Sequence, residues 1–328
     1  MKSKKNIKFI ALVILIFFYS LLYCVDASQQ INRYYDERFV IKDFNDNIDG
    51  YPYVSFSDGI MFNNKELVAS RISYSHKTDI SSEKKYGKII FFERTTEGLN
   101  KKYPNINYDK YNGELRDPNL SESNIPGTFF LSCFTTGENN SHTNVLMLLN
   151  ENYEVISDIE YKGGLAWGNT LISPDGYLLQ LTYGSGKVTL YKSVNVFDGN
   201  LQNMEFHDIA VLNTKDYPTE STIGYYNDKL VCISRTNKNL QITYTTDLEG
   251  KTGWSIPDDL GQKIHSPTLL SSFKGDKLIF AGSLEKGNTY RVPVIGYIDL
   301  IKKEIIDLKE IDNEIKKYRR IPFSYSNS

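Results

Sequence analysis

A carboxylate and a guanidinium stand at opposite ends of one short apolar segment of the sequence. Glu220 precedes a first apolar stretch, polar Asn227 and Asp228 interrupt it, and a second apolar stretch ends at Arg235. Apolar stretches on both sides of a two-residue polar turn are typical of a β-hairpin. Antiparallel pairing about this turn would bring the two ends together. The segment therefore predicts that Glu220 and Arg235 lie side by side at the rim of a sheet, as part of an active site or as a structural ion pair.

Other charged and imidazole side chains fall at the ends of similar strands. Asp117 is a candidate general acid, because a carboxylic acid can protonate a leaving oxygen, although an aspartate before proline also commonly caps a turn. Arg116 could line the same site or form an ion pair with Glu114. His265 is a candidate hydrogen-bond donor or base, or a plain loop residue. Two further candidates for substrate binding at strand ends are Arg71 and His76.

The hairpin recurs about every fifty residues along the chain. The second strands of five such hairpins are centred 62, 49, 52 and 48 residues apart, at Val68, Phe130, Leu179, Val231 and Ile279. Short strands with regular turn signals favour an all-β fold, and this period is typical of a four-stranded propeller blade. The apolar segments 38–41 and 304–308 could pair to form one further blade, which would remove an exposed sheet edge. We therefore predict a six-bladed β-propeller over residues 44–328, with five blades as the alternative.

The N-terminus resembles a targeting segment. Lysines at positions 2, 4, 5 and 8 precede an apolar run from Phe9 to Val25, and Ala27 follows. This order is typical of a signal peptide cleaved after Ala27, whereas an uncleaved membrane anchor is the alternative for residues 1–27. A lipoprotein attached through Cys24 is a third possibility. Residues 28–43 form a polar lead-in segment, and all versions place the protein outside the cytoplasm, secreted or anchored in a membrane.

The composition indicates which partners to expect. The net charge is −2, so no basic face for nucleic acid is predicted. The four histidines are scattered, and Cys133 and Cys232 lie in apolar strands as free core residues, so no metal site and no cofactor are expected. The 24 tyrosines and 17 phenylalanines suit both a β-rich core and a sugar-binding surface. We expect a monomer that binds a glycan or glycoconjugate.

Several of these segments, in this order, resemble the sialidase superfamily of six-bladed propellers with BNR repeats. The resemblance covers about residues 51–299. It includes a degenerate copy of the family's aspartate box (Ser-x-Asp-x-Gly-x-Thr-Trp) at residues 245–254, with two insertions. The segments that carry it are Glu220 with its hairpin to Arg235, His265-Ser266-Pro267, Tyr290-Arg291, Arg116-Asp117-Pro118 and Trp167-Gly168-Asn169.

The resemblance implies a chemistry for individual residues. Glu220 would activate a nucleophilic tyrosine, for which Tyr325 is the late candidate, and Arg235 and Arg291 would clamp a substrate carboxylate. Two features of the family are missing, because residues 50–54 contain no arginine and residues 83–86 contain no aspartate.

Three hypotheses follow. The first is an extracytoplasmic, sialidase-like glycoside hydrolase that acts on an acidic sugar of glycans through Glu220, Asp117 and Tyr325. The second is a related propeller enzyme with a different acidic substrate that uses Asp117 and His265. The third is a non-catalytic propeller that binds carbohydrate or protein at the same rim.

Overall fold

The described part of the chain is built from β-strands and one short 3-10 helix, η2 (Tyr108–Tyr111). The computed structural model describes residues 48–51, 53–74, 87–95, 98–111, 114–136, 142–270, 278–287 and 290–310. These residues all belong to one unit, Asp46–Ser328. None of them forms a helix that is both long and apolar enough to cross a membrane. The segments 1–27 and 28–43 lie outside the described residues.

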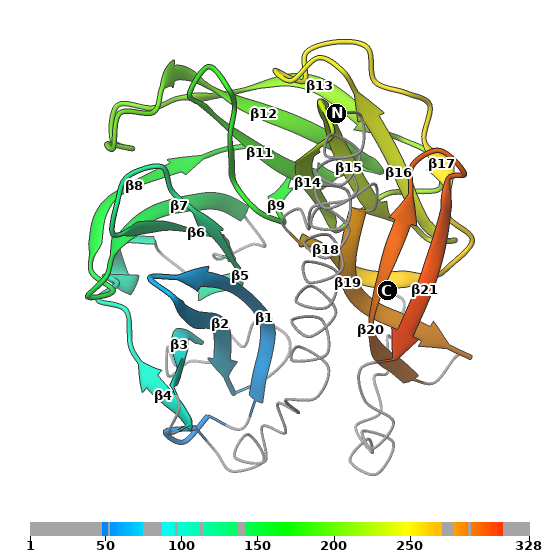
Figure 1. Ribbon diagram of the computed structural model, residues 1–328. Helices are drawn as coiled ribbons and strands as arrows, with labels where there is room; N and C mark the ends of the chain where they lie inside the picture. Colours follow the sequence, from blue (N-terminus) through cyan, green and yellow to red (C-terminus); the bar gives the residue numbers. More distant parts are fainter. Residues whose placement is uncertain are drawn as a thin grey trace, which may run out of the picture. The chain divides into compact units, whose positions relative to one another are not determined.

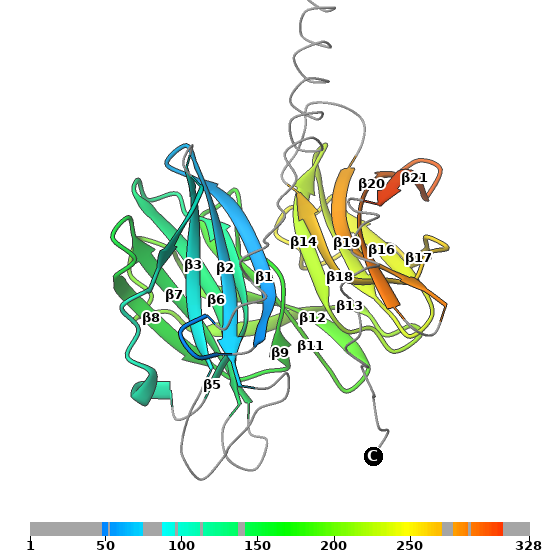
Figure 2. The ribbon, with the colours of Figure 1, turned by 90° about the horizontal axis from the view of Figure 1, so that it is seen from below.

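The strands form five antiparallel sheets, and each sheet uses consecutive strands in chain order. The first sheet contains β1 (Tyr53–Phe62), β2 (Lys65–Ser73), β3 (Lys88–Thr95) and β4 (Gly98–Lys102). The second contains β5 (Glu114–Glu122), β6 (Thr128–Thr136), β7 (His142–Asn150) and β8 (Val155–Tyr161). Figure 1 shows the sheets following one another from blue to red, and Figure 2 shows β1, β2 and β3 side by side in the first sheet.

The other three sheets repeat this plan with small changes. The third contains β10 (Leu171–Ile172), β11 (Tyr177–Gly184), β12 (Lys187–Val196) and β13 (Phe206–Asn213), and the short β9 (Leu165–Ala166) also pairs with β11. The fourth contains β14 (Ser221–Tyr226), β15 (Lys229–Arg235), β16 (Leu240–Thr245) and β17 (Asp258–Asp259). The fifth contains β18 (Ile264–Leu270), β19 (Leu278–Lys286), β20 (Tyr290–Asp299) and β21 (Glu304–Glu310).

The predicted hairpins are confirmed as the pairs β1–β2, β5–β6, β10–β11, β14–β15 and β18–β19, although β10 has only two residues. In the hairpin of β14 and β15, Tyr226 pairs with Lys229 across a two-residue turn. The turn residues Asn227 and Asp228 have φ angles of 45° and 55°. Asparagine and aspartate tolerate this left-handed conformation better than most residues, which is why they suit such tight turns.

Four separate apolar clusters join each sheet to the next one, and β6 contributes to two of them. Successive side chains of a strand point to opposite faces. Phe129 therefore packs between the first and second sheets, where its ring centre lies 5.7 Å from that of Phe91. The next residue, Phe130, packs between the second and third sheets, 5.1 Å from the ring of Phe197.

β15 repeats this alternation at the next two interfaces. Leu230 and Cys232 join the cluster between the third and fourth sheets. Val231 and Ile233 join the cluster between the fourth and fifth sheets. Because both faces of β15 are buried, its sequence is a continuous apolar run. Each large apolar side chain stabilises the folded state by about 1.5–3 kcal/mol when it is transferred from water to the core. Cys133 and Cys232 are free and buried, as expected from the sequence.

The prediction of six blades was wrong, and the fold is a five-bladed β-propeller. The segment 304–308 does not start another blade, because it belongs to β21, which pairs with β20 as the outermost strand of the fifth sheet. The segment 38–41 lies outside the described residues. Each sheet is already complete with its own consecutive strands, so the chain from 53 to 310 forms five blades.

Candidate active site

The first strands of the second and fifth sheets, β5 and β18, each contain a register shift, which changes the direction of the side chains beside it. The register of β5 shifts between Arg116 and Asn119, and that of β18 shifts between His265 and Thr268. In each strand the residue before a proline has a positive φ, 51° at Asp117 and 49° at Ser266. Bulges of this kind often lie next to active sites, where they redirect a side chain or a backbone amide.

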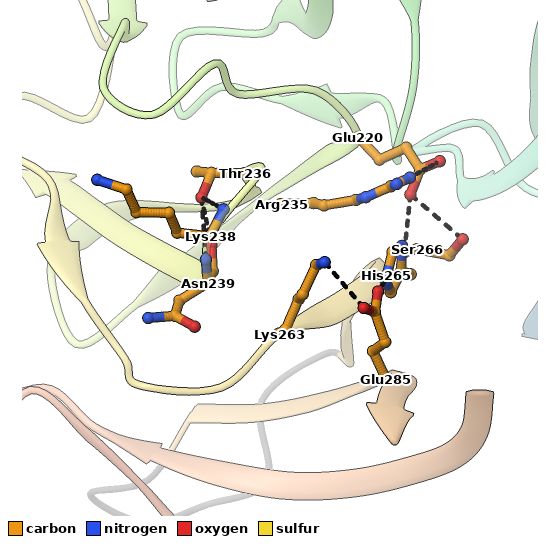
Figure 3. A network of polar contacts seen from close by, with 9 residues as sticks. All are labelled: Glu220, Arg235, Thr236, Lys238, Asn239, Lys263, His265, Ser266 and Glu285. Atoms are coloured by element: carbon orange, nitrogen blue, oxygen red, sulfur yellow. Dashed lines mark hydrogen bonds and ion pairs between the residues drawn. The ribbon is translucent and has the colours of Figure 1, made fainter. Parts of the chain in front are cut away.

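Glu220 directly precedes β14 and lies between the fourth sheet and the bulge of β18 (Figure 3). Its Oε1 accepts a hydrogen bond from Nη1 of Arg235 at 2.6 Å. Its Oε2 accepts one from the backbone N–H of Ser266 at 2.8 Å and one from the Ser266 hydroxyl at 3.4 Å. The prediction that Glu220 and Arg235 meet at one rim is therefore confirmed, and three donors fix the orientation of the carboxylate.

Asp117 is a second carboxyl group within electrostatic reach of Glu220. Its side chain is buried, with 6% of the residue exposed, and Oδ1 has no hydrogen-bond partner among the described residues. Burial raises the pKa of Asp117 to about 7, and the negative charge of Glu220 acts in the same direction. The positive charges of Arg116 and Arg71 act in the opposite direction. Near neutral pH this carboxyl group can therefore hold a proton and release it.

A buried ion pair lies beside Asp117. The Arg71 Nε donates to Oε1 of Glu114 at 2.7 Å, and the backbone N–H of Gly87 donates to the same oxygen at 3.1 Å. Both side chains are almost completely buried. A Cβ at position 87 would lie 2.0 Å from this oxygen, so the contact requires a glycine. Burial lowers the pKa of Arg71, although the charge of Glu114 opposes this change.

His265 forms the other side of the polar network. Its Nε2 lies 2.6 Å from Oε2 of Glu285, whose Oε1 accepts a hydrogen bond from Lys263 at 2.8 Å (Figure 3). Burial lowers the pKa of His265 to about 4, and the charges of Arg235 and Arg291 lower it further. The imidazole is therefore neutral at physiological pH. A carboxylate at Nε2 favours the tautomer with the proton on that nitrogen, so the buried Nδ1 is an acceptor.

The structure thus brings together most of the candidate residues. Asp117, Glu220 and Arg235 all influence the ionisation of Tyr183, a residue that the sequence did not single out. The other candidates that interact electrostatically with this group are Arg71, Arg116, His265 and Arg291. His76 and Tyr325 lie outside the described residues.

Two contributors were missed from the sequence, Glu285 on β19 and Tyr183 on β11, both in the second strands of their sheets. Glu114, which the sequence offered as a partner for Arg116, forms its buried ion pair with Arg71. The signal that could have indicated Glu285 is a carboxylate near the end of a strand that begins with an apolar run. No pattern in the sequence indicates that Tyr183 approaches the site.

The segment identified as a degenerate aspartate box forms a complete turn between β16 and β17. The Asp247 carboxylate accepts hydrogen bonds from the backbone N–H groups of Glu249, Lys251 and Thr252 at 3.0–3.1 Å. The indole of Trp254 donates to the Gly250 carbonyl oxygen at 2.8 Å. This turn stabilises the edge of one sheet and does not identify a family.

Comparison with known proteins shows similarity of fold. No protein-family model and no curated protein matches the sequence. A protein of unknown function from Dyadobacter fermentans has a TM-score of 0.58 and 11% identity, over 75% of this chain and 79% of that chain. An exo-β-1,3-galactanase from Clostridium thermocellum has a TM-score of 0.55 and 12% identity, over 79% of this chain and 63% of that chain. An endo-arabinase from Bacteroides thetaiotaomicron has a TM-score of 0.51 and 11% identity, over 74% of this chain and 93% of that chain.

These matches correct the resemblance drawn from the sequence. The chain is a five-bladed propeller similar in fold to family 43 glycoside hydrolases, and the resemblance to six-bladed sialidases with BNR repeats was wrong. The roles that the sialidase pattern implied for Glu220, Arg235, Arg291 and Tyr325 therefore no longer follow from it. What stands is the geometry of the described residues and a distant structural similarity to galactanases and arabinases.

Proposed function

We propose that this protein is a glycoside hydrolase and that Asp117 and Glu220 carry out the reaction. The observation that supports this most strongly is a pair of interacting carboxyl groups at the inner-strand ends of a propeller, of which one has a pKa raised to about 7. Most glycoside hydrolases use two carboxyl groups, one that protonates the leaving oxygen and one that acts on the opposite side of the sugar.

The environments of the two groups assign their roles. Asp117 is buried and holds a proton near neutral pH, so it donates that proton to the glycosidic oxygen as the C–O bond breaks. Glu220 accepts hydrogen bonds from Arg235 and Ser266, and it acts as the carboxylate that deprotonates water or attacks the sugar carbon. In both cases a water molecule supplies the hydroxyl group of the released sugar. If Glu220 deprotonates that water, Glu220 then loses the proton to solvent and Asp117 takes one up from solvent; if Glu220 attacks the sugar carbon, Asp117 deprotonates the water that breaks the bond between the sugar and Glu220, and so regains its proton.

The relatives indicate which sugars to test first. The similar structures are an exo-β-1,3-galactanase and an endo-arabinase, so galactans and arabinans are candidate substrates. An acidic sugar is a second candidate, because Arg291 forms no ion pair with any described carboxylate and interacts electrostatically with His265 beside Glu220. A uronate would offer the carboxylate that such a guanidinium binds.

Hydrolysis by the purified protein tests the proposal. We expect it to release sugar from at least one of β-1,3-galactotriose, a linear arabinotriose or trigalacturonic acid, measured by chromatography. Glu220→Gln should lower kcat/KM at least about 100-fold, because an amide cannot serve as base or nucleophile. Glu160→Gln, an exposed change on β8, is the matched control and should retain full activity. Binding of a sugar without any turnover would instead support a non-catalytic propeller.

We also propose that the protein acts outside the cytoplasm. The lysine-rich N-terminus followed by the apolar run 9–25 supports this assignment. Expression in a bacterial host followed by cell fractionation should recover the protein outside the cytoplasm, with Ser28 as its first residue if the leader is cleaved. A protein recovered in the cytoplasm with an intact N-terminus would contradict the proposal.

A further inference from the structure

Tyr183 is the penultimate residue of β11, and the charges of Asp117 and Glu220 act on it. Its partner in the neighbouring short strand β9 is Leu165. Three residues after Leu165, Gly168 packs so closely on β14 that a Cβ there would lie 2.5 Å from the carbonyl oxygen of Ser221. Since Ser221 directly follows Glu220, this contact holds the end of β11 close to the start of β14.

The backbone around Tyr183 is held by a buried side chain of the adjacent sheet. The Asn144 side-chain amide on β7 donates to the Gly164 carbonyl oxygen at 2.8 Å, and its side-chain oxygen accepts from the Ala166 N–H at 2.7 Å. Gly164 in turn lies against Tyr183, where a Cβ would come within 2.4 Å of the Tyr183 carbonyl oxygen. β9 is therefore fixed to the second sheet and supports Tyr183 from one side.

The side chain of Tyr183 has an apolar ring and a single polar group, its hydroxyl. The ring packs against the apolar cluster between the third and fourth sheets. Burial raises the pKa of Tyr183, and the negative charges of Asp117 and Glu220 raise it further. The phenol is therefore a hydrogen-bond donor at neutral pH and is unsuited to act as a phenolate nucleophile. Its hydroxyl makes no hydrogen bond to another described residue.

We propose that Tyr183 binds the substrate directly, by donating a hydrogen bond from its hydroxyl to an oxygen of the sugar whose glycosidic bond is cleaved. This proposal rests on the proposed function for the nature of the ligand. A donor whose ring is already fixed by packing loses little conformational freedom when the sugar binds. A site that hydrogen-bonds a sugar oxygen also discriminates against sugars that lack it. Tyr183 is thus a determinant of both affinity and sugar specificity.

Removing only the hydroxyl tests this role. The full chain with Tyr183→Phe is compared with the wild type by calorimetric titration of β-1,3-galactotriose, a linear arabinotriose and trigalacturonic acid, and by kcat and KM for those that are cleaved. We expect binding of the recognised sugar to weaken about tenfold, with a matching rise in KM. The melting temperature should stay unchanged, because the hydroxyl has no partner in the described protein. Tyr103→Phe, at an exposed tyrosine after β4, is the matched control and should bind as the wild type does.

The outcomes separate this inference from the proposed function. Equal affinity of Tyr183→Phe and wild type for every sugar that binds would overturn the inference, and so would a loss of affinity that only accompanies a lower melting temperature. Weaker binding by Tyr183→Phe of a sugar that the wild type binds but does not cleave would support the inference and contradict hydrolysis. A wild-type protein that neither binds nor cleaves any of the three sugars would overturn both.

Discussion

Replacing Asp117 by asparagine is expected to remove hydrolytic activity and, at the same time, to stabilise the folded protein above pH 7. Asparagine has the same shape and tolerates the left-handed backbone conformation at this position, where φ is 51°. Its amide cannot give up a proton to the leaving oxygen, so we expect kcat/KM to fall about 10³–10⁴-fold.

The gain in stability follows from the pKa of the wild-type carboxyl group. Burial raises this pKa from about 3.8 in the unfolded chain to about 7 in the folded protein. The folded state therefore holds the proton more tightly, and this contribution to stability is complete below about pH 4 and lost as the pH rises through 7. A pKa shift of about 3 units corresponds to a change of about 4 kcal/mol in unfolding free energy between low and high pH. Asp117→Asn has no group that titrates at this position, so this part of the pH dependence should disappear.

Urea unfolding at pH 5 and pH 8 measures this effect. The difference in unfolding free energy between the two pH values should be smaller in Asp117→Asn than in the wild type. Asp208→Asn, an exposed change on β13, should leave the difference as it is in the wild type. If Asp117→Asn shows the same pH dependence as the wild type, Asp117 is ionised in the folded protein and is not the proton donor.

Breaking the ion pair between Arg71 and Glu114 is expected to cause the largest loss of stability. Only 1% of the Arg71 side chain and 3% of the Glu114 side chain are exposed. Glu114→Gln leaves a buried guanidinium without its counter-charge, which should cost about 3–5 kcal/mol of unfolding free energy. The double variant Arg71→Met with Glu114→Leu removes both charges together and should be closer to the wild type in stability than either single variant.

The controls for this pair use an exposed counterpart. Lys302 and Glu304 form a pair whose side chains are 66% and 50% exposed. Glu304→Gln should therefore change the unfolding free energy by less than about 1 kcal/mol. A cost below 1 kcal/mol for Glu114→Gln would show that the buried pair does not stabilise the site. Because the charge of Arg71 lowers the pKa of Asp117, Arg71→Met should also move the pH dependence of activity upward.

The local parts of the fold could be predicted from the sequence, whereas the number of blades could not. The Asn227-Asp228 turn and the apolar runs around it identify a hairpin because both signals are local. The apolar segment 304–308 has the same pattern whether it completes the fifth sheet or begins a sixth. In the structure this segment pairs with β20. Which strand it pairs with depends on how the blades of the whole chain are arranged.

The same distinction holds for the site. Glu220 and Arg235 could be predicted as neighbours because one hairpin connects them. Arg71 and Glu114 are 43 residues apart on different sheets, so only the packing of the first sheet against the second brings them together. Tyr183 reaches the site for a similar reason, since its approach depends on the position of β9 between two sheets.

The pH dependence of sugar release tests most directly the claim that Asp117 protonates the leaving oxygen. We predict that kcat/KM of the wild type for the cleaved trisaccharide falls as the pH rises through about 7, where Asp117 loses its proton. Asp208→Asn should show the same profile, and Asp117→Asn should have almost no activity at any pH. No release of sugar at any pH, or equal rates for Asp117→Asn and the wild type, would contradict the claim.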